Sequence, residues 1–566
     1  MIGTRLHRIK LWTISGALAA TASLSAQTRV ATPDLILHHG HIFTGDLAHP
    51  WAEAISIVFD HILAVGTDAT IQPTAGPRTR LIDLQGRMAM PGVNDSHDHV
   101  GGASTGVEAQ TTHPPMADPS LQELAEAIRT AAAAAPSGDW IHAVVGTNTI
   151  RHPQEARAII DAAGAGHPVL LEAWWGHGVI LNGQALTKLA IGDSVNDPQG
   201  GHWDRDAQGH LTGLAEEYAG HAIRRRLATD AGVPASVTRM RAYAQRRLSE
   251  GVTSVQVMAT NETLSEFRQT FRQANVPLRF RIMRFPMPDE DKRVGERLAS
   301  GEEILTPLVR IAGVKWVLDG TPLEQLAYST KEYPNRPGWH GRPNFSREFI
   351  DQQLKNALNG KDQLMLHIVG DAMTDQVLDE MEKIAPAARW HPLRVRIEHA
   401  DGFTTSERDA RAKKLGLVIA QPRPGRPFRA LREAGIPLAY GSDDGMTPFF
   451  MLAQMTDTHN PNAITREEAL RVLTIGSSFA EFEEKKKGTL VPGMLADVAV
   501  LSQDVMTAPT EALPGTRSLL TLVGGKIAYS STDFAEPAVR KERDSRHPLC
   551  AERASKQSIM PPRLFQ

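Results

Sequence analysis

The apolar positions of this chain fall into two kinds of pattern. Near the N-terminus, in residues 35–83, short β-rich apolar runs are interrupted by Gly, Asp and Pro, and the same texture returns at 493–501 and 519–529. Short apolar runs between such residues predict strands joined by turns. We therefore expect a small β-sandwich domain built by both ends of the chain, from residues 27–90 and 487–530.

In the middle of the chain, apolar strand-like runs alternate with helical ones, which predicts an α/β fold. The expected strands span residues 88–94, 254–258, 278–283, 311–317, 363–367, 395–399, 417–420 and 438–441. Strands that alternate with helices in this way predict a (β/α)8 barrel of the TIM type, which we place at 91–486.

The first two of these strands lie unusually far apart along the chain. A barrel of about 250 residues has about 31 residues per strand–helix unit, and this step exceeds that length by roughly 130 residues. We therefore expect a large insertion after the first barrel strand, at about 100–250, with helices at 121–135 and 155–163. It would lie at the C-terminal loop end, where such a barrel keeps its active site.

The two ends of the chain differ from the rest. Basic residues precede an apolar stretch at 11–20, small residues follow, and no acidic residue comes before Asp34. This pattern predicts a signal peptide at 1–26, whereas a membrane anchor would need a longer apolar stretch. We expect the mature protein to be periplasmic or secreted, without stable membrane insertion. Residues 531–566 form a charged, turn-rich tail to which we assign no function.

Composition narrows the functional classes. Of 566 residues, 41% are hydrophobic and 22% are charged, which supports a sizeable core and excludes wholesale disorder. Lys and Arg number 61 against 64 Asp and Glu, so the net charge of −3 gives no basic footprint for nucleic acid or for anionic membranes. A single cysteine, Cys550, excludes an internal disulfide and a cluster of thiolate metal ligands.

A His-x-His pair gives the first chemical signal. His97 and His99 follow an apolar run that we expect to be a strand, and they precede a Gly-Gly turn. Residues two apart on a strand point to the same face, so two imidazoles at this spacing can bind one metal ion. A His-x-His pair alone is a weak signal, because surface histidine pairs are common.

Four more polar side chains lie at or near the C-terminal ends of predicted strands: Lys315, His367, His399 and Asp443. In a barrel these ends converge on one mouth, so residues far apart in sequence can meet there. Imidazole and carboxylate suit zinc, and also Mn, Fe or Co. Lys315 fits such a site only as a neutral amine or after modification, for example to a carbamate that bridges two metals. The alternative is a salt-bridged lysine beside the site.

The insertion contains the segment LLEAWWGHG at 170–178. His177 could donate to a substrate carbonyl or to a developing oxyanion, or it could be a buried histidine with a backbone partner. Trp174 and Trp175 could wall an apolar substrate pocket or pack inside the insertion. Glu216 and Glu217 read as a solvated helix start.

Several segments together resemble the amidohydrolase superfamily. PGVNDSHDH at 91–99 is similar to its first-strand motif, and VKWVLDG at 314–320, HIVGD at 367–371, RIEHA at 396–400 and GSDD at 441–444 are similar to later motifs. Residues 487–501 resemble its return into the β-domain, and the stretch from Gly176 to Asn182 resembles its Gly-His…Asn segment. Glu216 and Glu217 also resemble an acidic position of the family, which is the alternative to the solvated helix start. The set is most similar to the amidohydrolase family 3 branch, which includes N-substituted formamide deformylases.

Two segments depart from the family pattern. QPRPG at 421–425 stands where many relatives have Gln-Pro followed shortly by His, and Asp444 stands where Trp or Ala is frequent. Both lie near the expected mouth, so the resemblance does not identify the substrate.

The resemblance implies a metal-dependent barrel flanked by a β-sandwich. It implies that His97 and His99 bind a first divalent metal and that His367 and His399 bind a second. It further implies that Lys315 bridges them as a carbamate, and that Asp443 touches the first metal and moves protons. Whether the chain holds one metal or two, most simply zinc, is left open.

From these residues we expect an enzyme that hydrolyses a non-peptide carbon–nitrogen bond, of amide type, in a small molecule. The metal would lower the pKa of a water molecule and polarise the carbonyl, while Asp443 transfers protons. Two alternatives stay open: metal-dependent cleavage of an ester, lactone or phosphoester, and a non-catalytic binding protein on the same barrel. The sequence does not indicate the oligomeric state.

Overall fold

The computed structural model describes residues 31–100, 106–113, 117–287, 301–420, 428–443 and 445–534. The predicted signal peptide, the tail beyond residue 534, the 421–425 segment, Asp444 and Cys550 lie outside the described residues. Among the helices that are described, none has the length and apolar character needed to cross a membrane.

The centre of the molecule is a barrel of parallel strands in sequence order. Its strands are β8 (Val93–Asp98), β15 (Val252–Met258), β16 (Arg279–Arg284), β18 (Val309–Val317), β19 (Leu364–Ile368), β20 (Arg396–His399), β21 (Val418–Ala420) and β22 (Leu438–Ala439). Each pairs in parallel with the next. Backbone hydrogen bonds from Ser96 N to Tyr440 O (2.7 Å) and from Asp443 N to His97 O (2.9 Å) join the first strand to the last. The predicted α/β fold of the TIM type is confirmed.

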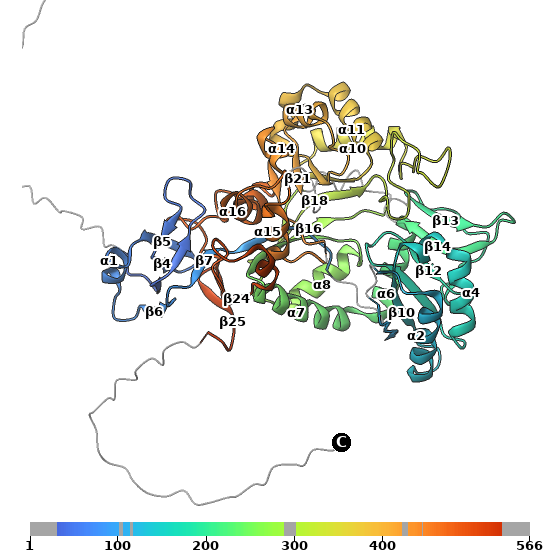
Figure 1. Ribbon diagram of the computed structural model, residues 1–566, viewed down its shortest axis with the longest axis horizontal. Coiled ribbons are helices and arrows are strands. Elements are labelled where there is room, and N and C mark those ends of the chain that lie inside the picture. The colour runs from blue at the N-terminus through green and yellow to red at the C-terminus, as the bar shows by residue number, and fades with distance from the viewer. Residues whose placement is uncertain are drawn as a thin grey trace, which may run out of the picture.

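Helices cover the outside of the barrel. They are α6 (Tyr218–Ala231), α7 (Val233–Ser249), α8 (Leu264–Ala274), α10 (Arg347–Asn359), α11 (Asp371–Ile384), α12 (Ala387–Trp390), α13 (Ser406–Leu415), α14 (Phe428–Glu433), α15 (Pro448–Thr456), α16 (Arg466–Arg471) and α17 (Ser477–Phe479). In Figure 1, α7 and α8 lie on one side of β16 and β18, and α10, α11 and α13 lie on the other. Local sequence fixes the starts of several helices: Thr263 and Glu266 form a capping box at α8, and Ser346 caps α10. One apolar cluster, which includes Phe280, Trp316 and Ile397, packs strands against helices.

The first barrel strand differs from the prediction. The apolar run expected at 88–94 is divided between two sheets, because β7 (Met88–Pro91) pairs outside the barrel and β8 begins only at Val93. Gly92 separates them, and a Cβ at this position would lie 2.2 Å from Thr253 Oγ1. The expected end of the strand at 94 was wrong because the remainder of β8 is polar yet buried, so no apolar pattern marks it.

Two further sheets lie beside the barrel. A six-stranded sheet has the order β25-β24-β23-β7-β2-β3 and joins both ends of the chain: β2 (His41–Phe43), β3 (Trp51–Ala52), β7, β23 (Val498–Leu501), β24 (Ser518–Val523) and β25 (Lys526–Ser530). A four-stranded sheet has the order β5-β4-β1-β6: β1 (Leu35–His38), β4 (Ala54–Val58), β5 (His61–Gly66) and β6 (Arg80–Asp83). One apolar cluster, with Leu37 and Ile55 from one sheet and Val498 and Leu522 from the other, packs them together.

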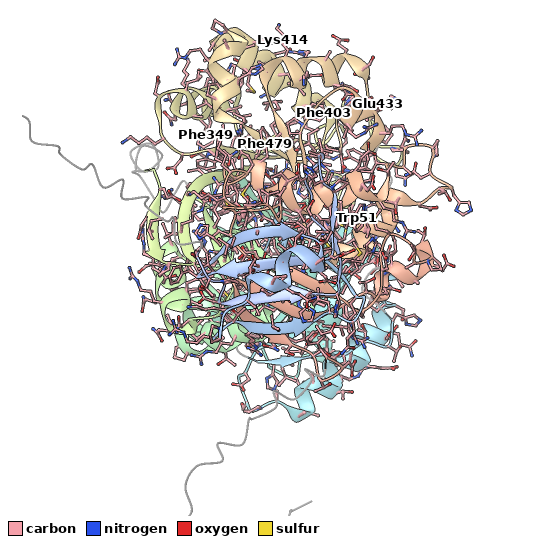
Figure 2. All side chains as sticks on the ribbon, turned by 90° about the vertical axis from the view of Figure 1, so that its left-hand side faces the viewer. Trp51, Phe349, Phe403, Lys414, Glu433 and Phe479 are labelled. Atoms are coloured by element: carbon pink, nitrogen blue, oxygen red, sulfur yellow. The ribbon has the colours of Figure 1, made fainter. Side chains whose placement is uncertain are left out.

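The aromatic edge of the six-stranded sheet turns towards the main core. Trp51 of β3, labelled in Figure 2, stacks on His41 with ring centroids 4.1 Å apart and packs against the barrel's apolar cluster. The division of the chain into a signal peptide, two β-sandwich segments, a barrel and a tail stays a prediction.

A second unit lies between β8 and β15. Its sheet, of order β13-β14-β12-β11-β10-β9, consists of β9 (Val107–Glu108), β10 (Ile141–Val145), β11 (Val169–Ala173), β12 (Val179–Leu181), β13 (Gly201–Arg205) and β14 (Leu211–Glu217). Its helices are α2 (Leu121–Ala134), α3 (Thr147–Arg151), α4 (Pro153–Ala163) and α5 (Gly183–Lys188), and two apolar clusters of its own support it. In Figure 1 this unit lies at the right of the barrel. Strand β14 is followed directly by helix α6, so the C-terminal end of β14 lies next to the barrel.

Shorter elements complete the chain. They are α1 (Asp68–Ile71), β17 (Glu303–Thr306), and the helical turns η1 (Gln72–Thr74), η3 (His391–Leu393), η4 (Val472–Gly476) and η5 (Thr510–Gly515). β17 pairs antiparallel with β18 outside the barrel order.

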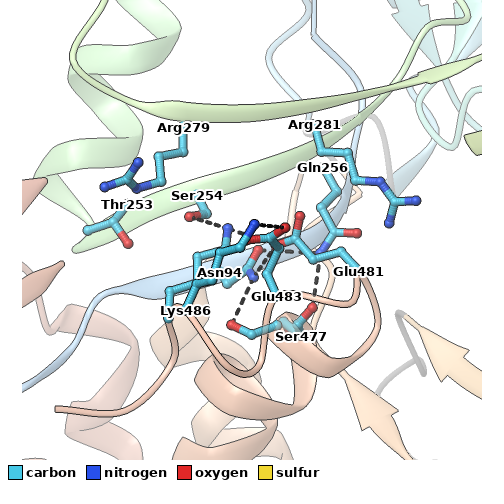
Figure 3. Close-up of polar contacts among 12 residues, drawn as sticks. Asn94, Thr253, Ser254, Gln256, Arg279, Arg281, Ser477, Glu481, Glu483 and Lys486 are labelled. Carbon is cyan, nitrogen blue, oxygen red and sulfur yellow. Dashed lines mark hydrogen bonds and ion pairs between the residues drawn. The ribbon is translucent and has the colours of Figure 1, made fainter. Parts of the chain in front are cut away.

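Polar groups fill the N-terminal end of the barrel. Glu481 accepts a hydrogen bond from Asn94 (2.7 Å) and pairs with Lys487 (2.7 Å), which itself donates to Ser254 (2.8 Å) (Figure 3). Gln256 donates to the carbonyl of Ser477 at 3.1 Å. These contacts satisfy buried polar groups of β8 and β15 and tie both strands to the segment around α17.

Candidate metal centre

The structure gathers the imidazole side chains predicted as ligands at the C-terminal end of the barrel. His97 lies on β8, His367 on β19, and His399 ends β20, while His99 follows β8 directly. The ring of His97 lies 5.3 Å from His99 and 5.1 Å from His399, and the ring of His367 lies 4.4 Å from His399, measured between centroids. Segments separated by hundreds of residues meet here because the ends of barrel strands converge.

Asp443 lies among these imidazoles. Its Oδ1 is 3.5 Å from His97 Nε2 and 3.4 Å from His99 Nε2. Two ligand atoms at about 2.0–2.2 Å from one tetrahedral ion lie about 3.3–3.5 Å apart, so these spacings fit a single divalent metal. The ligand atoms of His97, His399 and Asp443 all lie within 4.8 Å of one another. Imidazole and carboxylate donors without a thiolate fit zinc and its neighbours in the first transition row.

Hydrogen bonds orient both members of the His-x-His pair. His97 Nδ1 lies 2.5 Å from Glu398 Oε2, and His99 Nδ1 lies 2.9 Å from Thr260 Oγ1. With each Nδ1 held in this way, each Nε2 faces Asp443. Outer partners of this kind fix the ring and its tautomer at metal centres.

Charges around His97 favour the form that binds metal. Burial, together with the nearby Lys315, lowers the pKa of His97 to about 4, so its imidazole is neutral near pH 7. Burial alone would raise the pKa of Glu398, but Arg396 and Lys315 hold it well below its ordinary value. Arg396 makes two hydrogen bonds to that carboxylate, from Nε at 2.9 Å and from Nη2 at 3.0 Å.

Lys315 lies on β18 within the same buried group. Burial lowers the pKa of its amine to about 8, while Glu398 and Asp443 act in the opposite direction. A buried lysine that interacts electrostatically with Glu398 and Asp443 suits both of the expected roles, a modified ligand or a charged neighbour. The split of the ligands between one or two metals stays a prediction.

His177 reaches the site from the insertion. It lies in the turn between β11 and β12, and its ring centroid is 4.7 Å from that of His367. Its Nδ1 lies 2.9 Å from Glu217 Oε1, so a buried carboxylate is one of its partners. His177 therefore joins the barrel's imidazoles to an acidic group of the insertion.

The two tryptophans lie in different surroundings. Trp174 is 39% exposed, whereas Trp175 packs against the apolar cluster of the insertion. The Nε1 of Trp175 donates to Glu324 Oε2 at 2.6 Å. The packing alternative thus describes part of the contacts of Trp175, and the role of either residue in a substrate pocket stays a prediction.

The expectation for Glu216 and Glu217 was right about the helix and wrong about the solvent. Glu217 ends strand β14 and is the N-cap residue of α6, so the pair lies at a helix start, but Glu217 is buried. Glu216 pairs with Arg342 at 2.9 Å, and Glu217 binds His177. The pattern of the helix marked the position, but it could not show that the strand before it carries Glu217 into the interior.

Sequence reasoning also missed Glu398, Thr260 and Glu324. Glu398 adjoins His399, and neighbouring residues of a regular strand point to opposite faces. His399 has a φ of +72°, which ends the regular alternation and lets both residues serve the site. For Glu398, the only signal in the sequence was its position within the RIEHA segment. Thr260 and Glu324 lie in loops without a periodic pattern.

The chain is similar to several known proteins. The model of the amidohydrolase family matches residues 80–529. Protein LONG AFTER FAR-RED 3 of Arabidopsis thaliana is 27% identical over 554 residues, covering 88% of this chain and 91% of that protein. N-substituted formamide deformylase of Arthrobacter pascens is 23% identical over 550 residues, covering 88% and 99%.

A solved structure shares the fold. An uncharacterised metal-dependent hydrolase from Pyrococcus horikoshii OT3 superposes with a TM-score of 0.63 at 20% identity, covering 84% of this chain and 99% of that one.

Replacing Glu398 by Gln is expected to weaken zinc binding about 10- to 100-fold, because His97 loses the charged partner that orients it. Zinc affinity is measured by competition with a chelating dye. Glu481→Gln is the matched control, since Glu481 is also buried and paired, with Lys487 and Arg310, but at the other end of the barrel. Equal zinc affinity of Glu398→Gln and the wild type would contradict the prediction.

Proposed function

The chain belongs to the amidohydrolase family, and on that premise we propose that it hydrolyses a non-peptide carbon–nitrogen bond, of amide type, in a small molecule. The observation that carries the proposal is the carboxylate of Asp443 placed 3.4–3.5 Å from two oriented imidazoles at the barrel mouth. The name of one relative, N-substituted formamide deformylase, supports an amide over an ester.

The side chains around the site have distinct tasks in this reaction. A divalent metal held by the imidazoles of His97, His99, His367 and His399 would supply activation of a water molecule and polarisation of a substrate carbonyl. Asp443, whose side chain is 26% exposed, accepts a proton from the water and passes it to the leaving nitrogen. His177 donates a hydrogen bond to the carbonyl oxygen as negative charge develops on it.

We propose zinc as the metal and two ions per chain, with His97 and His99 at the first and His367 and His399 at the second. Lys315, buried beside Glu398 and Asp443, would bridge them as a carbamate. Elemental mass spectrometry of the purified protein is expected to give about two metal ions per chain. About one ion would leave Lys315 as a charged neighbour, and none after reconstitution would favour a binding protein.

A panel of matched substrates tests the bond type. Formanilide and 4-nitroacetanilide are compared with phenyl formate and 4-nitrophenyl acetate, and we expect turnover of at least one amide. Asp443→Asn should lower kcat about 10²- to 10⁴-fold, because the carboxylate that moves the proton is gone. Its metal content should stay near that of the wild type.

Two outcomes would overturn these assignments. Turnover of the esters without either amide would move the enzyme to the esterase class. Full amide hydrolysis by Asp443→Asn would remove Asp443 from proton transfer.

We also propose export, because the first 26 residues combine basic residues, a short apolar stretch and small residues in the order of a signal peptide. N-terminal sequencing of the protein recovered from the periplasm or medium is expected to begin near residue 23 or 27. A mature chain that starts at Met1 would contradict export by this signal.

A further inference from the structure

A buried acidic group lies next to the metal centre, on the side of the insertion. It consists of His177, Glu217 and Glu324, whose side-chain nitrogen and oxygen atoms lie within 4.8 Å of one another. The three residues come from the β11–β12 turn, the end of β14 and the segment after β18. Both carboxylates are buried. The predicted ligand set includes neither of them.

Glu217 fixes the imidazole of His177 at one nitrogen. Nδ1 of His177 lies 2.9 Å from Glu217 Oε1, and Asn344 Nδ2 donates to the other carboxylate oxygen at 3.3 Å. Asn344 also donates to the carbonyl of Val317 at 3.1 Å, which ties the carboxylate to the barrel strand that carries Lys315. Glu217 and Asn344 thus connect the His177 ring to the barrel strand β18 by hydrogen bonds.

The backbone at Glu217 is held in an unfavourable conformation. Its φ of +54° and ψ of −122° lie outside the regions that side-chain-bearing residues ordinarily adopt. Such a conformation is energetically unfavourable and persists where surrounding contacts over-determine it, often at functional sites. The strain occurs where β14 ends and α6 begins, and it brings the carboxylate inward.

A glycine makes room for the two carboxylates. A Cβ at Gly320 would lie 2.5 Å from Glu324 Oε1 and 2.9 Å from Glu217 Oε1. Glu324 is in turn held by Thr321 Oγ1 and Trp175 Nε1, each at 2.6 Å. Trp175 lies two residues before His177, so this second carboxylate anchors the turn that carries the imidazole.

We propose that Glu217 is a positioning residue that holds His177 with its second ring nitrogen directed at the carbonyl oxygen of a substrate in the metal centre. Glu324 supports the same turn through Trp175. This inference rests on the proposed amide hydrolysis, in which His177 is the donor to the oxyanion.

A double-mutant cycle on kcat and KM tests the inference, with the amide of the panel that is turned over best. His177→Ala should lower kcat about 10²- to 10³-fold, and Glu217→Ala about 10- to 100-fold. KM should change little. The double variant should lie within about twofold of His177→Ala, because Glu217 acts only through that ring. Glu217→Gln, which can still accept from Nδ1, should recover part of the loss.

Two controls separate positioning from general damage. Glu216→Gln changes the neighbouring carboxylate, which pairs with Arg342 and not with His177, and it should keep kcat within about twofold of the wild type. The metal content of every variant should match the wild type. Loss of metal from Glu217→Ala would make Glu217 a ligand and overturn the inference.

A structural readout stands apart from activity. Crystal structures of the wild type and Glu217→Ala are expected to show the His177 ring turned away from the mouth in the variant only. An unmoved ring, or losses that simply add in the double variant, would overturn the inference. If no amide is turned over, the proposed function fails, whereas the ring position still decides the role of Glu217.

Discussion

The hydrogen bond from Asp443 N to His97 O, 2.9 Å long, joins the last barrel strand to the first. The carboxylate of the same residue lies against His97 and His99, so the residue that closes the barrel also belongs to the candidate metal centre. The φ of Asp443, +48°, turns the chain at this point. A chain that failed to close here would lose the site along with the last strand pairing.

This closure places an unusual demand on β8, whose polar residues are all buried. Most of them receive a side-chain partner: Asn94 donates to Glu481, Asp95 pairs with Arg247 and accepts from Ser442 N, and Asp98 accepts from Tyr243. The exception is Ser96, whose buried hydroxyl has no hydrogen-bond partner among the described residues. Removing one partner of a buried ion pair costs far more than the pair contributes in net stability. Because other arrangements would leave buried charges unpaired, this network favours one arrangement of the strands around the site. It occupies a region that an apolar core would otherwise fill.

The difference between apolar strands and the polar strand β8 explains what the sequence could predict. Most barrel strands are buried on both faces and read as apolar runs, so the expected strand at 311–317 lies within β18 and the one at 417–420 nearly coincides with β21. The extent of β8 was not predicted. Its polar residues are buried because they have partners on α7, α17 and β20, and no local sequence pattern indicates those partners. The meeting of the four histidines at the barrel mouth was predictable because strand ends converge in any barrel, whereas their role as ligands stays a prediction. The proximity of Glu217 and Glu324 was not predictable, because it depends on how the insertion sheet packs. In addition, a pair of glutamates before a helix is commonly exposed to solvent.

The insertion and the barrel contribute different parts of one site. The barrel supplies the candidate metal ligands from strands whose positions the closed sheet fixes, whereas His177 is held by Glu217 and by the Trp175–Glu324 contact. Because β14 passes directly into α6, the end of the insertion sheet is tied to a helix that packs on the barrel. A change of sequence within the insertion can therefore move His177 without altering the residues at the ends of the barrel strands. In a family that shares the barrel, substrate choice can diverge by this route while the metal chemistry is retained.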